Sequence, residues 1–211
     1  MDERDGVKRT WDSNSSAWMK RVSGSDDILR HKVVLPEFLK LLGSIEGKRI
    51  IDIGCGDGSL AVQLRNLGAQ VDAIDISPAM IELARSFKSA KGITYHVGDF
   101  SSNTILHDRY FDAATSFMAL MKFSELDQTL SKAAASLKPG GKLVIAILHP
   151  CFSTQGSAWI RTKVSGKTGK FVSNYFAEQA YETEIRLDTD AKGELVDLRF
   201  PRTLSDYINS L

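Results

Sequence analysis

Residues 50–58 read IIDIGCGDG, a run of β-branched apolar residues that leads directly into a glycine-rich turn. The apolar run predicts a buried strand, and the residues after the turn predict a helix. Glycine tolerates positive φ angles and leaves no Cβ between the backbone and a bound molecule. The first N–H groups of a helix have no partner within it and face outward. The stretch therefore predicts a turn that closely approaches an adenosine-bearing ligand.

Acidic residues stand at the ends of the next two predicted strands. Asp75 follows residues 71–74, and Asp99 with Phe100 follows residues 93–98. A carboxylate at a strand end can accept both ribose hydroxyls, and each such bond is worth on the order of 1.5–3 kcal/mol. The acid and aromatic pair suits the amino group and the face of an adenine ring. Residues 110–118 and 137–147 then predict two more strands.

The glycine spacing separates two classes of ligand. A dinucleotide-binding turn has the spacing G-x-G-x-x-G/A, whereas here Gly58 comes one residue early and position 59 is serine. With Asp52 upstream, this G-x-G-x-G turn resembles motif I of the class I S-adenosylmethionine-dependent methyltransferases. The two acids and the later strands follow in that family's order. The resemblance covers residues from about 48 to 150.

The resemblance implies S-adenosyl-L-methionine as the cofactor. Asp75 is the strongest single candidate for binding it. In the family, a helical segment before the sheet covers the cofactor, and an aromatic residue in it often touches the ligand, so Trp11 and Trp18 are candidates; packing of this segment on the sheet is the alternative. The expected cofactor-binding residues are Trp18, Asp52, Gly54, Cys55, Gly56, Asp75, Ile76, Met80, Asp99, Phe100, Ser116 and Phe117.

Strand and helix patterns alternate over residues 46–150, which predicts an α/β fold with a doubly wound, Rossmann-like parallel sheet covered by helices on both faces. The resemblance implies the strand order 3-2-1-4-5. Ser77-Pro78 predicts the start of one helix, as an N-cap followed by proline in the first turn. We expect one domain with three segments: an N-terminal helical cap at 1–45, the cofactor-binding core at 46–150 and an antiparallel lid at 151–211.

After Pro150 the chain changes to short segments separated by turns. Residues 157–165, 171–176, 182–187 and 195–200 are expected to be extended beside the last parallel strand, with a hairpin loop at 188–193, and residues 200–211 to enter a helix. In the family that helix precedes two further strands, and no residues remain here to build them. Either the chain is a fragment, or the lid or a partner chain covers the open sheet edge, as in a homodimer.

The composition is that of a globular protein, with 43% hydrophobic and 25% charged residues in 211. Lys+Arg 27 and Asp+Glu 26 leave a net charge of +1, which disfavours dedicated binding of nucleic acid or of a membrane. The basic, aromatic stretch from Trp159 to Phe171 could bind RNA, although a solvated hairpin face is the favoured interpretation.

Neither a signal peptide nor a membrane-spanning stretch is predicted, so we expect a cytoplasmic protein. The N-terminus is highly charged and lacks the apolar core that a signal peptide requires. Cys55 and Cys151 are the only cysteines, and they predict neither a disulfide framework nor a metal site.

Methyl transfer from a sulfonium is a direct displacement, so the protein mainly supplies orientation and a dry pocket. A general base helps if the acceptor is a hydroxyl or a protonated amine. His149, directly after the fifth predicted strand, is the candidate, and a structural histidine before Pro150 is the alternative. Many family members carry a histidine in the loop after the fourth strand, where this chain has Met121-Lys122. The apolar residues of that loop favour an acceptor pocket or core packing.

Three functions fit these residues. Methyl transfer to an O, N or C atom of a small molecule is the favoured one. The loop after the fourth strand lacks an Asn/Asp-Pro-Pro-Tyr/Phe run, which argues against methylation of a nucleobase or glutamine amino group. A cofactor-binding accessory protein without turnover is the first alternative. A nicotinamide-dependent oxidoreductase is the second, and Ser59 in place of a glycine counts against it.

Overall fold

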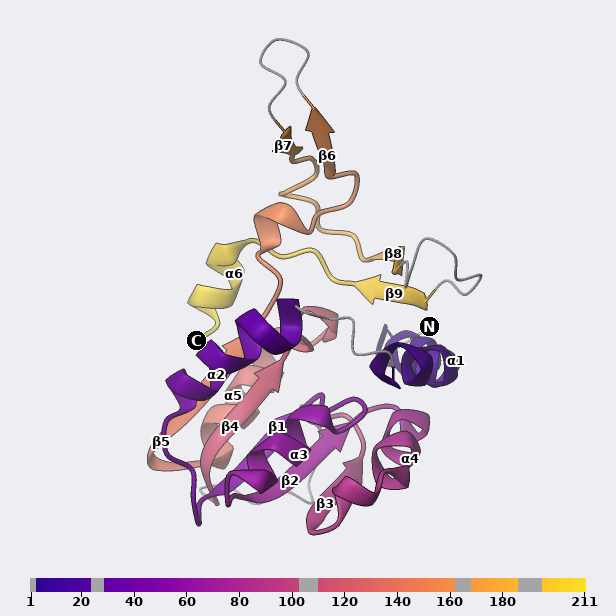
Figure 1. Ribbon diagram of the computed structural model, residues 1–211. Coiled ribbons are helices and arrows are strands. Elements are labelled where there is room, and N and C mark those ends of the chain that lie inside the picture. The colour runs from indigo at the N-terminus through magenta and orange to yellow at the C-terminus, as the bar shows by residue number, and fades with distance from the viewer. Residues whose placement is uncertain (1–2, 24–28, 103–109, 162–167, 186–194) are drawn as a thin grey trace.

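The computed structural model describes residues 3–23, 29–102, 110–161, 168–185 and 195–211 (Figure 1). Its centre is a five-stranded parallel sheet in the order β3-β2-β1-β4-β5. The predicted doubly wound, Rossmann-like sheet and its strand order are therefore confirmed. The strands are β1 (Arg49–Ile53), β2 (Gln70–Asp75), β3 (Ile93–Val97), β4 (Phe111–Phe117) and β5 (Leu137–Ala146).

Helices precede, connect and follow these strands. The chain begins with α1 (Glu3–Ser23), and a π-helical turn, Leu29–Val34, leads into α2 (Leu35–Leu42). The connecting helices are α3 (Ser59–Asn66), α4 (Pro78–Ser86) and α5 (Leu126–Ser136), and α6 (Leu204–Asn209) lies near the C-terminus. Single 3-10 turns occur at Lys88–Ala90, Leu120–Lys122 (η3) and Pro150–Phe152. The predicted cap at Ser77 is confirmed, because its hydroxyl accepts the Met80 N–H at 3.1 Å.

Successive side chains of a strand point to opposite faces of the sheet. Helices cover both faces, so the side chains on both are buried. Ile50 of β1 packs in one cluster with Phe38 of α2 and Leu64 of α3. Its neighbour Ile51 packs in a second cluster with Ala133 of α5. The continuous apolar run that predicted a strand is thus the run that a doubly covered parallel strand requires.

The glycine turn connects β1 to α3 and packs tightly against its surroundings. Gly58 has a φ of 75° and forms the N-cap of α3. A Cβ at this position would lie 2.5 Å from the Tyr95 hydroxyl and 3.1 Å from the Ala84 Cβ. Glycine is therefore required here both for its backbone conformation and for lack of space.

Two antiparallel strand pairs follow the parallel sheet. They are β6 (Ala158–Arg161) with β7 (Thr168–Phe171), and β8 (Tyr181–Ile185) with β9 (Leu195–Arg199). The extended segment predicted at 171–176 lies earlier in the structure, because the chain turns at Asn174, whose φ is 54°. The hairpin loop predicted at 188–193 lies outside the described residues.

The second pair is held on α1 and not beside β5 as predicted (Figure 1). The Asn14 side chain donates to the Val196 carbonyl at 2.5 Å and accepts the Val196 N–H at 3.3 Å. One amide of α1 therefore satisfies both backbone groups of a residue in β9. The sequence pattern did not reveal this contact, since it joins residues 182 positions apart.

The two glycines Gly58 and Gly92 provide a matched test of the turn. Both have positive φ, but a Cβ at Gly92 would meet nothing within 4 Å. We expect Gly92→Ala to lower the free energy of unfolding by about 1 kcal/mol and Gly58→Ala by roughly 2–4 kcal/mol, because the second change adds steric overlap to backbone strain. Urea unfolding of both variants measures the difference, and equal losses would contradict the packing described here.

Candidate active site

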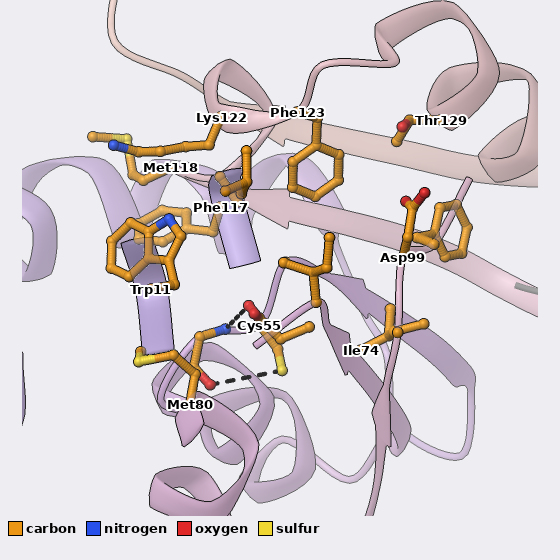
Figure 2. Close-up of a pocket in the computed structure, with 18 of the residues that line it drawn as sticks. Trp11, Cys55, Ile74, Met80, Asp99, Phe117, Met118, Lys122, Phe123 and Thr129 are labelled. Atoms are coloured by element: carbon orange, nitrogen blue, oxygen red, sulfur yellow. Dashed lines mark hydrogen bonds between the residues drawn. The ribbon is translucent and has the colours of Figure 1, made fainter. Parts of the chain in front are cut away.

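A cavity lies at the carboxyl ends of β1, β2, β3 and β4, on the side that α1 covers (Figure 2). This is the place where parallel α/β sheets bind ligands. Of the residues predicted to bind the cofactor, the structure brings most into its lining: Trp18, Gly54, Cys55, Gly56, Asp75, Ile76, Met80, Asp99, Phe100 and Phe117. The glycine turn and Asp75 thus face one common crevice.

The Asp75 carboxylate joins three parts of the cavity floor. Its Oδ2 accepts the Gly56 N–H at 2.9 Å, and its Oδ1 accepts the Ser77 N–H at 2.9 Å. Burial raises the pKa of this carboxyl to about 6, although the two N–H donors act to lower it. Each carboxylate oxygen has a second lone pair, so Asp75 can still accept two hydroxyl groups from a ligand.

Asp99 and its neighbours form the end of the cavity next to β3. The Asp99 carboxylate accepts the Ser101 N–H at 3.0 Å and the Ser101 hydroxyl at 2.8 Å. Arg4 of α1 lies 3.6 Å from the same carboxylate. Phe100 is buried in the core cluster that α5 covers. This end therefore combines an acceptor group with an apolar wall, as adenine recognition requires.

Helix α1 is tied to the floor of the cavity by polar contacts that the sequence analysis missed. The Trp18 indole donates to Asp57 at 3.0 Å, and Asp57 also accepts the Ser59 N–H at 3.0 Å. Asp12 accepts the Ser77 hydroxyl at 2.6 Å and the Ala79 N–H at 3.3 Å, so it lies at the N-terminus of α4. A carboxylate is favourable there because unpaired N–H groups carry partial positive charge.

The opposite wall carries aromatic rings and one buried ion cluster. Trp11 and Trp18 pack edge to face with ring centroids 5.5 Å apart. The Lys122 ammonium lies 5.4 Å from the Trp11 ring centroid and forms an ion pair with Asp197 of β9. Asp197 is fully buried and also accepts the Arg199 Nε at 2.8 Å. Lys122 lines the cavity, so β9 positions a cation at its wall.

Asp52 and Ser116, which were predicted to bind the cofactor, lie outside the cavity lining. Asp52 is fully buried one residue before the end of β1, where its Oδ1 accepts the Thr115 hydroxyl of β4 at 3.1 Å. Ser116 donates to the Ile53 carbonyl at 3.1 Å. Both side chains therefore connect β1 to β4, because each lies inside a strand and not at its end. Neither side chain is in the cavity lining, so their role in binding the cofactor stays a prediction.

His149 is exposed and does not line the cavity, which corrects its placement as a candidate base. It precedes the 3-10 turn Pro150–Phe152, and its Nδ1 accepts the Cys151 N–H at 3.2 Å. These contacts agree with the alternative interpretation, a structural histidine before Pro150. Cys55 does line the cavity, and burial raises the pKa of its thiol well above the ordinary value. The Cys55 thiol is therefore protonated at neutral pH and is no nucleophile.

Within the described residues, no three His, Cys, Asp or Glu side chains are grouped so that they could hold a metal ion. None of the helices in the same residues combines the length and the apolar content of a membrane span.

Comparisons with known proteins agree with this geometry. A family model described as a methyltransferase domain matches residues 51–145. A ubiquinone biosynthesis O-methyltransferase from Xanthomonas euvesicatoria is 32% identical over 54% of this chain and 48% of its own length. A demethylmenaquinone methyltransferase from Tropheryma whipplei is 36% identical over 53% of this chain and 46% of its own. The chain spans about half the length of these curated relatives.

Solved structures extend the similarity beyond the matched domain. An S-adenosylmethionine-dependent methyltransferase from Mesorhizobium loti covers 83% of this chain and 77% of its own length, with 28% identity and a TM-score of 0.67. A protein from Listeria monocytogenes, at 23% identity and a TM-score of 0.66, shares the fold. Fold and cavity define a Rossmann-like nucleoside-binding protein. Residues 51–145 match the methyltransferase-domain model, and the fold is similar to that of an S-adenosylmethionine-dependent methyltransferase, so S-adenosylmethionine is the cofactor that this similarity implies.

Replacing Asp75 tests the cavity floor. We expect Asp75→Asn to weaken binding of S-adenosylmethionine and S-adenosylhomocysteine by at least about tenfold at pH 7.5, because an amide loses charge-assisted bonds to the ribose. Calorimetric titration measures both affinities. Asp72→Asn on the same strand is the control, since Asp72 binds His96 at 2.7 Å and does not line the cavity. Equal effects of the two changes would show that Asp75 has no special role.

The pH dependence of cofactor binding follows from the same carboxyl. Because burial raises the pKa of Asp75 to about 6, the carboxylate becomes protonated as the pH falls through 6 in the empty protein. We expect the affinity of wild-type protein for S-adenosylhomocysteine to fall below that pH, and the affinity of Asp75→Asn to change much less. Parallel pH profiles in the same titration would contradict this assignment.

Asp52 gives an independent prediction on stability. Burial raises its pKa from 3.8 to about 7, and its Oδ2 has no hydrogen-bond partner among the described residues. The folded protein therefore binds a proton that the unfolded chain releases, and stability from this group is lost as the pH rises through about 7. We expect Asp52→Asn to gain stability relative to wild type between about pH 4 and 8, by on the order of 2–4 kcal/mol. Urea unfolding of both proteins without cofactor at several pH values measures the difference in their free energies of unfolding. A difference that does not change with pH would contradict the raised pKa of Asp52.

Proposed function

We propose that this chain transfers a methyl group from S-adenosylmethionine to a small aromatic acceptor that carries a hydroxyl group. One observation carries the proposal: a single cavity has nucleoside-binding groups on one wall and an aromatic wall with a lysine on another. Asp75 and Asp99 belong to the first wall, and Trp11, Lys122 and Phe123 to the second. The names of the curated relatives, which include a ubiquinone biosynthesis O-methyltransferase, support an aromatic acceptor.

The chain's own residues can perform the acceptor's part of the reaction. Trp11 and Phe123 provide flat apolar surfaces against which an aromatic ring can pack. The Lys122 ammonium favours the ionised form of an acceptor hydroxyl at the same wall, because an adjacent positive charge lowers a hydroxyl's pKa. The oxyanion is the stronger nucleophile. The hydroxyl proton would be released to bulk water. The cofactor, when bound, would supply an activated methyl group, with its thioether as the leaving group.

A turnover assay separates this function from its alternatives. Purified protein is incubated with S-adenosylmethionine and a panel of phenols, catechols and hydroquinones, and release of S-adenosylhomocysteine is measured. We expect turnover with at least one hydroxylated ring. Tight cofactor binding without turnover on any acceptor would favour the accessory protein, and binding of NAD without binding of S-adenosylmethionine would favour the oxidoreductase.

Lys122 is the residue that tests the acceptor wall. We expect Lys122→Met to lower kcat/KM for a hydroxyl acceptor by about 10–100-fold and to leave cofactor affinity within about twofold, because the change removes charge only on the acceptor side. Lys142→Met, at an exposed position of β5, is the control. Lys122→Met leaves Asp197 paired with Arg199 at 2.8 Å, so the variant should stay folded, and its thermal unfolding midpoint checks this. Wild-type activity in Lys122→Met would contradict the role.

A further inference from the structure

The β6–β7 ribbon, formed by Ala158–Arg161 and Thr168–Phe171, is separate from the site described above. Figure 1 shows it extending away from the central sheet, with its strands paired to each other. Ribbon residues do not contribute to the cavity at the sheet. No role in methyl transfer accounts for its exposed side chains.

The ribbon exposes large apolar side chains on both faces. Trp159 is 72% exposed, Ile160 45% and Phe171 52%. Trp159 pairs with Lys170 across the strands, whereas Ile160 and Phe171 belong to the alternate pairs with Gly169 and Ala158. Because successive residues of a strand face opposite sides, Trp159 lies on one face, and Ile160 and Phe171 lie on the other. An exposed two-stranded ribbon of this kind has no core to stabilise it.

The ribbon is also the basic part of a chain that is otherwise slightly acidic. Residues 151–177 contain four Lys or Arg and no Asp or Glu, while the other 23 Lys and Arg stand against all 26 Asp and Glu. Among the described side chains, the Lys170 ammonium lies 5.5 Å from the Trp159 ring centroid. Tryptophan is enriched at the interface between lipid headgroups and hydrocarbon, and a basic side chain beside it is attracted to anionic headgroups.

Hydrogen bonds close the base of the ribbon, and one further bond ties the chain after it to α6. The Ser173 N–H donates to the Ser157 hydroxyl at 3.3 Å, and the Ser173 hydroxyl donates to the Gln155 carbonyl at 2.8 Å. Two residues further on, the Tyr175 hydroxyl accepts the Leu204 N–H at the start of α6. These bonds hold the ribbon in its extended position, so the apolar side chains are presented outward without folding back.

We propose that the β6–β7 ribbon docks on an anionic lipid surface, with Trp159, Ile160 and Phe171 entering the interface and Lys170 meeting acidic headgroups. Although the net charge of the whole chain is only +1, residues 151–177 contain four Lys or Arg and no Asp or Glu, and this local positive charge together with the two-sided apolar surface supports this occupant. A lipid interface surrounds an inserted ribbon and covers both of its faces, whereas a second copy of the chain would cover one face only. RNA bases could stack on the Trp159 and Phe171 rings, but they would leave the exposed aliphatic side chain of Ile160 uncovered.

Vesicle sedimentation of the whole chain tests the docking. Vesicles of phosphatidylcholine alone are compared with vesicles that also contain phosphatidylglycerol, with neither cofactor nor methyl acceptor present. We expect binding to the anionic vesicles that weakens with added salt and a blue shift of tryptophan emission on binding. The double change Trp159→Ser with Phe171→Ser should weaken binding by at least about tenfold, because it removes two apolar anchors. Both side chains are exposed, so folding is retained.

Matched variants make the result decisive. Leu41→Ser removes an apolar side chain that is 67% exposed on α2, and it should bind vesicles as wild type does. Lys170→Gln should weaken binding to anionic vesicles more than to neutral ones. The proposal is overturned if wild type binds no vesicles, or if the double variant binds as tightly as wild type. It is also overturned if the double change instead abolishes self-association or binding of a single-stranded RNA oligonucleotide.

Discussion

The carboxylate of Asp75 is the constraint on which the site depends. It ends β2 and accepts N–H groups from the glycine turn after β1 and from the residue that caps α4. The glycine turn, 19 residues away in the chain, is thereby fixed to the turn that joins β2 to α4. Burying this acid opposes its ionisation, and the two N–H donors offset part of that cost, so the group is held in place before any ligand arrives.

Helix α1 completes the cavity through side chains that bond to the sheet region and not through apolar packing alone. Asp12 binds the start of α4, Trp18 binds Asp57 in the glycine turn, and Asn14 binds β9. Each bond satisfies a polar group that would otherwise be partly buried without a partner. The helix therefore has a defined orientation over the cavity and brings Trp11 and Arg4 to it.

The alternation of strands and helices, the turn and Asp75 could be predicted because each follows from local sequence and from the rule that parallel strands end at one edge, whereas the strand order rested on the family resemblance. Asp52 and Ser116 were placed in the cavity because one residue decides whether a side chain lies at a strand end or inside the sheet. His149 was misplaced because the chain turns away after β5. The contacts of Asp12 and of Lys122 with Asp197 join distant segments, and no local pattern encodes them.

Asp197 has a consequence for any attempt to alter the acceptor by transplanting segments between relatives. The buried Asp197 carboxylate pairs with Lys122 of η3 and with Arg199 of its own strand, and these ion pairs couple η3 to β9. Importing a foreign η3 without its native β9 would leave a charge in the interior without its ion-pair partner, which is destabilising. Chimeras would therefore have to exchange the two segments together, although 75 positions separate them in the chain.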